Sequence, residues 1–160
     1  MILKEEDLLR QLNWFYSLEI EQVDLYTTQA RAATDIYLRQ VLTRVADIEQ
    51  RHVTNLAAEI RRRGATPTRL GAIIAPILGQ VAGTMLNWTN TLTVLRANIA
   101  LEEKAMADYR QLILKVGEKP LFDMLWDHLI DEDLHTAWFS NKARELALLR
   151  ARKMGNRNKL

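Results

Sequence analysis

Histidine is scarce in this chain, and two of its three histidines follow a glutamate by three residues. The two pairs are Glu49 with His52 and Glu132 with His135. Residues three positions apart share one face of an α-helix, so each pair could hold a metal ion between a carboxylate and an imidazole. The chain contains 11 glutamates, so either pair alone could arise by chance. The case for a metal site therefore depends on what accompanies the pairs.

A longer arrangement of the same residue types occurs twice. Each Glu-x-x-His pair is preceded by another glutamate 30 residues earlier, and the second arrangement lies 83 residues after the first. The residues Leu18, Glu19, Tyr26, Glu49 and His52 recur as Leu101, Glu102, Tyr109, Glu132 and His135. The repeat predicts two structurally equivalent helical hairpins related by a pseudo-twofold axis.

Four carboxylates and two imidazoles are a donor set suited to two metal ions. Oxygen donors accompanied by nitrogen favour iron or manganese, and the absence of cysteine excludes a thiolate site. A single glutamate on a helix is usually a solvated surface residue, but unpaired acids in the apolar stripes of three helices would be destabilising. The predicted ligands are Glu19, Glu49, His52, Glu102, Glu132 and His135.

Glu49 and Glu132 are expected to bridge the two ions, because each also lies beside a histidine on its own helix. The ions of such a pair usually lie about 3.5–4 Å apart. Three acids close to predicted ligands, Glu21, Glu103 and Asp133, are expected not to bind metal. A step of one or two residues turns a side chain roughly 100–200° around the helix.

The first half of the chain is typical of a helical hairpin. Apolar residues recur at helical spacing from Glu5 to about Ala33. Thr34 is expected to cap the next helix, with Asp35 in its first turn. That second helix ends in three consecutive arginines followed by Gly64, which is a typical C-terminal signal.

A second hairpin is predicted after a long connection over residues 65–91. Its first helix runs from about residue 90 to Val116 and ends at Gly117. Pro120 is expected in the first turn of the last helix, which continues to about Lys153. Residues 154–160 are expected to fray. The chain is therefore interpreted as one domain over residues 1–153.

The two hairpins place the candidate ligands at one level. Glu19 and Glu49 each lie about fifteen residues from the turn near Thr34, which corresponds to roughly 22 Å along a helix. Gly117 stands midway between Glu102 and Glu132 in the same way. Four long helices with one long, partly helical crossover form an all-α, ferritin-like four-helix bundle, a fold that builds metal sites in its core.

This pattern resembles the ferritin-like di-iron carboxylate superfamily, over roughly residues 8–145. The Glu-x6-Tyr element is similar to rubrerythrins, although a rubredoxin-like domain is missing because the chain has no cysteine. The spacing to Glu49 and the charge-poor crossover are similar to the demethoxyubiquinone hydroxylase family. That family has a histidine before the second tyrosine, where this chain has Asp108.

The resemblance implies an oxidoreductase in which two iron ions activate O2 or peroxide, with electrons supplied by a separate donor protein or reductant. An iron-binding or ferroxidase-type protein without an organic substrate would use the same ligands, and a purely structural bundle would use none of them. In similar bundles an Asp at the position of Asp131 hydrogen-bonds the opposite histidine, here His52, although a surface role is equally open. His128 could contact a ligand or belong to the core. Tyr26 and Tyr109 could hydrogen-bond the ligand carboxylates or only pack.

Charge and hydropathy restrict the partners. The net charge is only +2, which gives little reason to expect nucleic acid. The acidic N-terminus does not resemble a secretory signal, so a cytoplasmic location is expected.

No charged residue occurs from Leu70 to Leu95. This stretch is expected to be soluble or interfacial rather than transmembrane, because it contains Pro76 and several polar residues. Its apolar residues would pack against the bundle end, a second subunit or a membrane surface, and a homodimer is the preferred alternative. Peripheral membrane contact would be assisted by a basic C-terminal tail. The residues in question are Ile73, Ile74, Ile77, Leu78, Val81 and Met85, with Gly79 and Gly83 permitting close helix approach.

Overall fold

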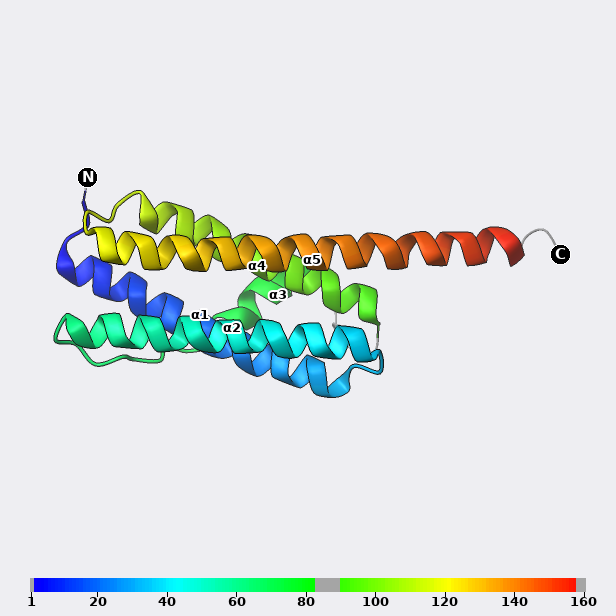
Figure 1. Cartoon of the computed structure of the whole chain (residues 1–160), viewed down its shortest axis with the longest axis horizontal. Helices are drawn as coiled ribbons and strands as arrows, with labels where there is room; N and C mark the ends of the chain where they lie inside the picture. Colours follow the sequence, from blue (N-terminus) through cyan, green and yellow to red (C-terminus); the bar gives the residue numbers. More distant parts are fainter. Residues whose placement is uncertain (1, 83–89, 158–160) are drawn as a thin grey trace.

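The helices of the molecule form two antiparallel hairpins that pack side by side (Figure 1). The structure is a computed structural model and describes residues 2–82 and 90–157. Its helices are α1 (Glu5–Ala32), α2 (Ile36–Arg62), α3 (Ile74–Ala82), α4 (Thr91–Ile113) and α5 (Lys119–Arg157). The hairpins are α1 with α2 and α4 with α5, and α3 lies in the crossover between them. The predicted all-α bundle of two hairpins and a partly helical crossover is confirmed.

The turn between α1 and α2 differs in detail from the prediction. Asp35, not Thr34, is the N-cap of α2, and its side chain accepts a hydrogen bond from the backbone N–H of Leu38 at 2.7 Å. A carboxylate in this position both satisfies a free N–H and opposes the positive end of the helix dipole. At the other end of α2, Gly64 takes a positive φ of 76°, as the C-terminal signal predicted.

Glycine and proline mark the turn of the second hairpin. A side chain at Gly117 would approach Ile2 to 3.0 Å, so the turn is closely covered by the N-terminal segment. Pro120 lies in the first turn of α5, as predicted. The helix then continues to Arg157, four residues past the predicted end at Lys153, because no proline interrupts this part of the sequence. Residues 158–160 of the predicted tail lie outside the described residues.

Two apolar clusters fill the interior of the bundle. One contains Leu12, Phe15, Leu56, Leu101, Tyr109 and Leu125, and the other contains Tyr26, Leu42, Leu95 and Phe139. Along α1, α2 and α5, the candidate metal ligands come between the residues of the first cluster and those of the second. Apolar packing therefore holds the helices together on both sides of the layer that contains the candidate ligands.

The crossover is attached to α1 by polar contacts. The side chain of Asn13 accepts a hydrogen bond from the backbone of Thr68 at 2.6 Å, and Ser17 accepts one from Leu70 at 2.8 Å. Further along, the carboxylate of Glu21 accepts from the backbone N–H groups of Ile73 and Ile74. These acceptors fix the path of the crossover into α3.

The apolar residues of α3 pack on the chain's own bundle. Ile74 and Leu78 are each 6% exposed and belong to the first apolar cluster, with Ile73 and Ile77 partly buried against it. Of the three predicted partners, the bundle is therefore the one that covers these residues, and they do not need a second subunit. The predicted contacts of Val81 and Met85, and the close approach at Gly79 and Gly83, fall outside what the structure describes. None of the described helices is both long and apolar enough to span a bilayer.

Candidate metal centre

Six side chains from four helices converge between the two apolar clusters. α1 contributes Glu19, α4 contributes Glu102, and α2 and α5 each contribute a Glu-x-x-His pair. The four carboxylates are completely buried, and the two imidazoles are 1% and 5% exposed. The structure therefore brings together all six predicted residues, namely Glu19, Glu49, His52, Glu102, Glu132 and His135.

One half of the cluster surrounds His52. Its Nδ1 atom lies 3.0 Å from Oε2 of Glu49, 3.4 Å from Oε1 of Glu132 and 3.8 Å from Oε2 of Glu19. Four donor atoms, one from each residue, lie within 4.8 Å of one another. This spacing is compatible with four donors around one ion, because oxygen and nitrogen ligands lie about 2.0–2.2 Å from such metals.

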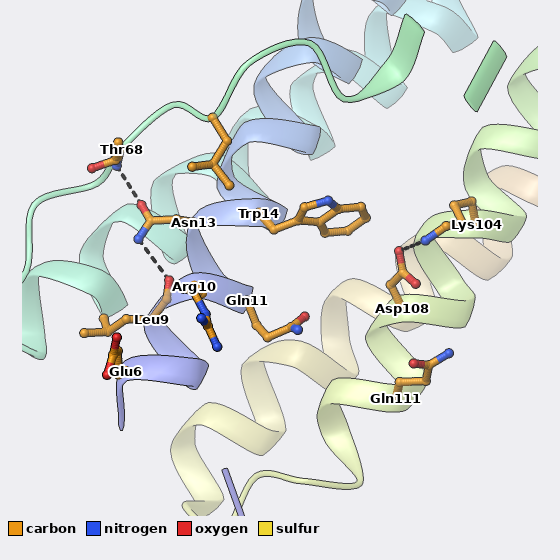
Figure 2. Close-up of a pocket in the computed structure, with 11 residues that line it drawn as sticks. Glu6, Leu9, Arg10, Gln11, Asn13, Trp14, Thr68, Lys104, Asp108 and Gln111 are labelled. Carbon is orange, nitrogen blue, oxygen red and sulfur yellow. Dashed lines mark hydrogen bonds and ion pairs between the residues drawn. The ribbon is translucent and has the colours of Figure 1, made fainter. Parts of the chain in front are cut away.

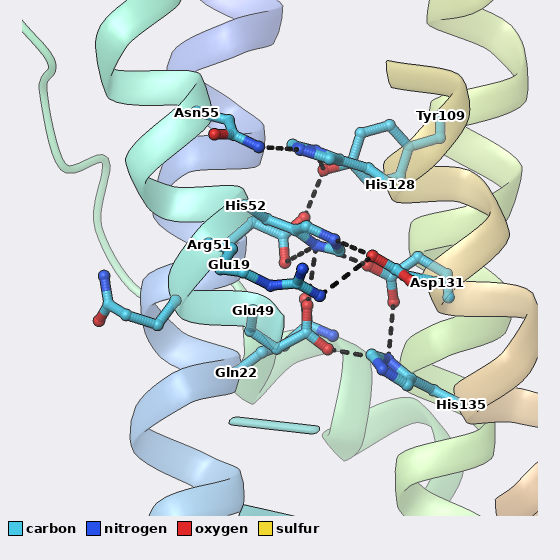
Figure 3. Close-up of polar contacts among 12 residues, drawn as sticks. Glu19, Gln22, Glu49, Arg51, His52, Asn55, Tyr109, His128, Asp131 and His135 are labelled. Carbon is cyan, nitrogen blue, oxygen red and sulfur yellow. Dashed lines mark hydrogen bonds and ion pairs between the residues drawn. The ribbon is translucent and has the colours of Figure 1, made fainter. Parts of the chain in front are cut away.

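The other half surrounds His135 and uses the opposite oxygens of the same two carboxylates. Its Nδ1 atom lies 3.0 Å from Oε1 of Glu49, 3.8 Å from Oε2 of Glu132 and 3.9 Å from Oε1 of Glu102. Glu49 thus directs one oxygen toward each half (Figure 3). The distances show that Glu132 does the same. Two four-residue groups that share two carboxylates have the composition of a doubly bridged dinuclear site.

The atoms that face the centre of the cluster lack hydrogen-bond partners among the described residues. They are Oε2 of Glu19, both carboxylate oxygens of Glu49 and of Glu132, and the Nδ1 atoms of His52 and His135. Leaving a buried polar atom unpaired costs about 1–3 kcal/mol, and more for a charged group. Two divalent ions would satisfy these atoms at once, so the donor set fits the predicted metal pair.

Burial prevents the carboxylates from all being ionised without metal. Burial, together with the nearby charge of Glu132, raises the pKa of Glu19 to about 8. Burial likewise raises the pKa of Glu102 well above its ordinary value. Burial also opposes the ionisation of Glu132, but its proximity to Glu102, His135 and His52 lowers its pKa. At neutral pH the cluster therefore keeps protons on Glu19 and Glu102.

The two histidines carry the remaining compensating charge. Burial disfavours the charged form of His135, but contacts with Glu132 and Glu49 prevail and raise its pKa to about 10. Burial opposes the protonation of His52 in the same way, and its acidic neighbours, beginning with Asp131, raise its pKa. Without metal, both imidazoles are therefore protonated at neutral pH.

Tyrosine hydroxyls hold the two outer carboxylates from the opposite hairpin. Tyr26 on α1 donates to Glu102 on α4, and Tyr109 on α4 donates to Glu19 on α1. Both tyrosines are fully buried. The sequence allowed these tyrosines either to hydrogen-bond the ligand carboxylates or only to pack. The hydrogen bonds are present, and each joins one hairpin to the other. Gln22, which the sequence did not single out, donates to Glu102 as well, at 3.3 Å.

His52 is held from outside the cluster. Its Nε2 atom lies 3.1 Å from the Asp131 carboxylate, so the predicted contact of Asp131 is present. The ring of His128 stacks on that of His52, with centroids 3.9 Å apart. Burial lowers the pKa of His128 to about 3, so this ring is neutral. Its Nδ1 contacts Tyr109 and its Nε2 contacts Asn55, and it thus joins a hydrogen-bonded network beside the cluster.

The three acids expected not to bind metal lie away from the cluster. Glu103 and Asp133 are exposed on the helix surface, and Glu21 caps the N-terminus of α3. Two polar residues of the network, Gln22 and Asn55, were missed. Each lies three residues after a predicted ligand, so the helical spacing used for the glutamate and histidine pairs could have found them.

Two pockets on the surface of the described residues lie away from the cluster. A pocket of about 690 Å³ lies between α1 and α4, where Trp14 faces the ion pair of Lys104 and Asp108 (Figure 2). A second pocket, of about 480 Å³, is lined by Asn55 and Asp127. None of the six clustered residues lines either one. Only the second contacts the network around the cluster, through Asn55.

Comparison with known proteins assigns the fold and the family. The model of the ferritin-like domain matches residues 9–149, and the chain therefore belongs to the ferritin-like family. The expected superfamily membership is confirmed. No curated protein sequence matches the chain.

Three solved structures illustrate the similarity. A bacterioferritin of Desulfovibrio desulfuricans, whose description refers to a diiron site in different catalytic states, is 18% identical with a TM-score of 0.73 over 90% of this chain and 82% of that one. A dodecameric thioferritin from Bacteroides fragilis, described as bacterioferritin-related, is 17% identical with a TM-score of 0.76 over 93% and 91%. A ferritin-like diiron-carboxylate protein from Bacillus anthracis is 21% identical with a TM-score of 0.70 over 88% and 99%. At these identities the likeness establishes the shared fold.

Proposed function

We propose that the chain is a non-haem di-iron carboxylate oxidoreductase that reduces O2 or peroxide. The observation that carries this proposal is the division of Glu49 and Glu132 between two donor groups, each completed by one histidine and one further glutamate. Buried polar atoms in a purely structural bundle are normally hydrogen-bonded, whereas seven possible metal-binding atoms at this level have no hydrogen-bond partner among the described residues.

The six residues would hold two ferrous ions, with manganese as the other metal that this donor set suits. Glu49 and Glu132 would bridge the ions. His52 with Glu19 would complete one position, and His135 with Glu102 the other. Two ferrous ions would supply two electrons, which with two protons reduce one O2 molecule to peroxide or one peroxide molecule to two water molecules. A separate donor protein or reductant would supply the two electrons for each further turnover.

The protein's own contribution is to orient the ligands and exclude water. Tyr26 and Tyr109 fix the outer carboxylates, and Asp131 fixes the ring of His52. The apolar clusters on either side of the six residues would exclude bulk water from the metal site. Such outer contacts set ligand geometry and the properties of a bound metal.

Iron handling is the second candidate, with ferrous iron itself as the reductant. The observation that favours it is the complete burial of the four carboxylates, which leaves the cluster suited to ions and small oxidants rather than to a bulky organic substrate. The resemblance in fold to a bacterioferritin is compatible with this alternative. O2 consumption with excess ferrous iron separates the two. An iron-handling protein oxidises many ferrous ions per chain, whereas a resident centre stops after its own two until an external reductant is added.

Metal analysis tests the site itself. Protein loaded anaerobically with ferrous iron should retain two ions per chain after desalting. Replacing Glu102 with Ala should reduce that content, whereas replacing its exposed neighbour Glu103 with Ala should leave it unchanged. Equal effects of the two substitutions, or retention of no metal by the unaltered protein, would contradict the proposed centre.

We also propose that the chain forms a homodimer through the outer face of α5. Large apolar side chains recur there every four residues with 37–61% exposure, namely Phe122, Trp126, Ile130 and Leu134. The residues 83 positions earlier are polar, namely Arg39, Thr43, Asp47 and Arg51, so the fold does not require this apolar face. A stripe of this kind is seldom left in water. Light scattering should report a dimer that the Trp126→Lys variant disrupts, and a monomer that binds anionic liposomes would favour a membrane instead.

A further inference from the structure

The two halves of the cluster are built from equivalent residues, but the surroundings of their histidines differ. Nε2 of His52 lies 3.1 Å from the carboxylate of Asp131. The 83-residue repeat places Ile48 in the position equivalent to Asp131. Nε2 of His135 has no hydrogen-bond partner among the described residues, although that histidine is only 5% exposed. One candidate ligand is therefore anchored, and the other is not.

The equivalence of the halves is supported by their reciprocal contacts. Tyr26 donates to Glu102, and Tyr109, the repeat partner of Tyr26, donates to Glu19, the repeat partner of Glu102. Both histidines direct Nδ1 toward the shared carboxylates. The difference between Asp131 and Ile48 is thus a local difference within a common frame.

A second difference concerns the face of the imidazole. The ring of His128 stacks on His52 with an angle of 22° between the planes, and Asn55 and Tyr109 hold His128 in place. The position equivalent to His128 is occupied by Val45, which offers no hydrogen bond. His52 therefore has fewer alternative orientations than His135.

A third difference affects the outer carboxylates. Glu102 accepts hydrogen bonds from two side chains, Tyr26 and Gln22, whereas Glu19 accepts one from Tyr109. The position equivalent to Gln22 is Ala105, which cannot donate. Glu102 is therefore held by one more contact than Glu19. The outer carboxylates do not favour the Glu19 position, so the expected inequality depends on the surroundings of the two histidines.

We propose, on the basis of the metal centre proposed above, that its two positions are unequal. The position at Glu19 and His52 binds the first divalent ion, and the position at Glu102 and His135 binds the second about 10–100-fold more weakly, which is the range associated with loss of such an outer contact. A metal-bound His52 would use Nδ1 as ligand and donate its Nε2–H to Asp131. Asp131 is accordingly a positioning residue, and Ile48 is the reason that the second position is weaker.

Titration of the metal-free, full-length protein with cobalt(II) tests this proposal. Cobalt(II) binds to the same kinds of ligand as ferrous iron, and under nitrogen it binds without being oxidised. Calorimetry should resolve two binding steps, and visible absorption should develop with a break at one ion per chain. At one equivalent, proton NMR should show one strongly shifted, exchangeable imidazole N–H signal, from His52.

Two substitutions exchange the surroundings of the histidines. Asp131→Ile should weaken the first step about 10–100-fold, merge the two steps and abolish the shifted N–H signal. Ile48→Asp should strengthen the second step and add a second shifted N–H signal at two equivalents. Asp131→Asn preserves the shape and an acceptor oxygen, so it should retain the signal with a smaller loss of affinity. Circular dichroism of each metal-free variant checks that the bundle is intact.

The outcomes distinguish this inference from the proposed function. Two equal binding steps in the unaltered protein, or a first step that Asp131→Ile leaves unchanged, would overturn the inequality while the metal centre stands. If the unaltered protein binds no metal, the centre itself is overturned and the inequality with it. Should Ile48→Asp unfold the chain, the pair Asp131→Ile and Asp131→Asn still decides the role of Asp131.

Discussion

The hydroxyl of Tyr109, on α4, donates a hydrogen bond to the carboxylate of Glu19, on α1. Both residues are fully buried, and the contact joins the two hairpins at the level of the proposed metal centre. The equivalent bond runs in the opposite direction, from Tyr26 on α1 to Glu102 on α4. The proposed metal ligands thus also link the halves of the bundle, so ligand orientation and hairpin packing depend on each other.

Replacing Tyr109 with Phe should destabilise the protein by about 1–3 kcal/mol, because it leaves a buried carboxyl oxygen without its donor. It should also weaken metal binding, since Glu19 loses its orienting contact. Urea unfolding of the metal-free and metal-loaded protein measures both effects. Tyr37→Phe is the matched control, because Tyr37 is 58% exposed. Equal stability of the two variants would show that the Tyr109 hydroxyl contributes little.

Metal binding should release protons. Glu19, Glu102, His52 and His135 all have raised pKa values in the metal-free cluster and hold protons at pH 7. Two divalent ions require these ligands in their deprotonated forms, so binding displaces up to four protons and affinity should rise with pH. Calorimetry in buffers with different ionisation enthalpies counts the protons. Binding without proton release would contradict the charge balance described for the cluster.

The stability of the metal-free protein should fall as the pH rises through the alkaline range. Glu19 has a pKa raised from 4.5 to about 8, and His135 one raised from 6.5 to about 10. Between its two pKa values, each group holds a proton in the folded state that it has released in the unfolded state. Its contribution to the free energy of unfolding is therefore lost as the pH rises through the pKa of the folded state. His128 acts oppositely, because its lowered pKa costs stability as pH falls from 6.5 toward about 3.

Thermal unfolding between pH 6 and pH 10 checks this expectation. The metal-free protein should lose melting temperature across this range, while ferrous or manganous ion raises the melting temperature by binding the native state. The metal-loaded protein should also vary less with pH, because the metal replaces the protons. A melting temperature that metal leaves unchanged would indicate a structural bundle without a metal function.

Much of the fold was predictable because its determinants are local. Helical periodicity, Gly64 and Pro120 marked the helices, and the 83-residue repeat selected six residues that the structure then brings together. The choice of Asp35 over Thr34 as the cap of α2 was missed, because both are acceptable cap residues and the backbone geometry of the turn decides between them.

Contacts between helices were harder to predict. The sequence left open whether Tyr26 hydrogen-bonds a ligand carboxylate or only packs, and it did not indicate that its hydroxyl reaches Glu102 on the other hairpin. Which face of α3 is covered likewise depends on how the crossover lies against the bundle. Periodicity indicates that a helix face is apolar but not which surface covers it. The prediction that a second subunit covers Ile74 and Leu78 was wrong, because the chain's own bundle covers them.

The bridging role of Glu49 predicts a difference between single substitutions. Glu49 directs one oxygen to each half of the cluster, whereas Glu19 contacts only the half around His52. Glu49→Ala should therefore impair both positions and reduce the retained metal to well below one ion per chain. Glu19→Ala should spare the position at His135. Metal analysis after desalting distinguishes the two, and an equal loss from both variants would contradict the assignment of Glu49 as a bridge.

Replacing Glu21 should loosen the crossover without affecting the proposed metal centre. Its carboxylate accepts hydrogen bonds from the backbone N–H groups of Ile73 and Ile74 at 2.8–3.0 Å, and it thereby anchors the start of α3 to α1. Loss of a capping side chain typically costs about 0.5–2 kcal/mol. Glu21→Ala should therefore increase hydrogen exchange and protease cleavage within residues 65–82 while two metal ions are still retained. Glu103→Ala, which removes an exposed acid, is the matched control. Loss of metal from Glu21→Ala with an unchanged crossover would instead make Glu21 a ligand and contradict its role as the cap of α3.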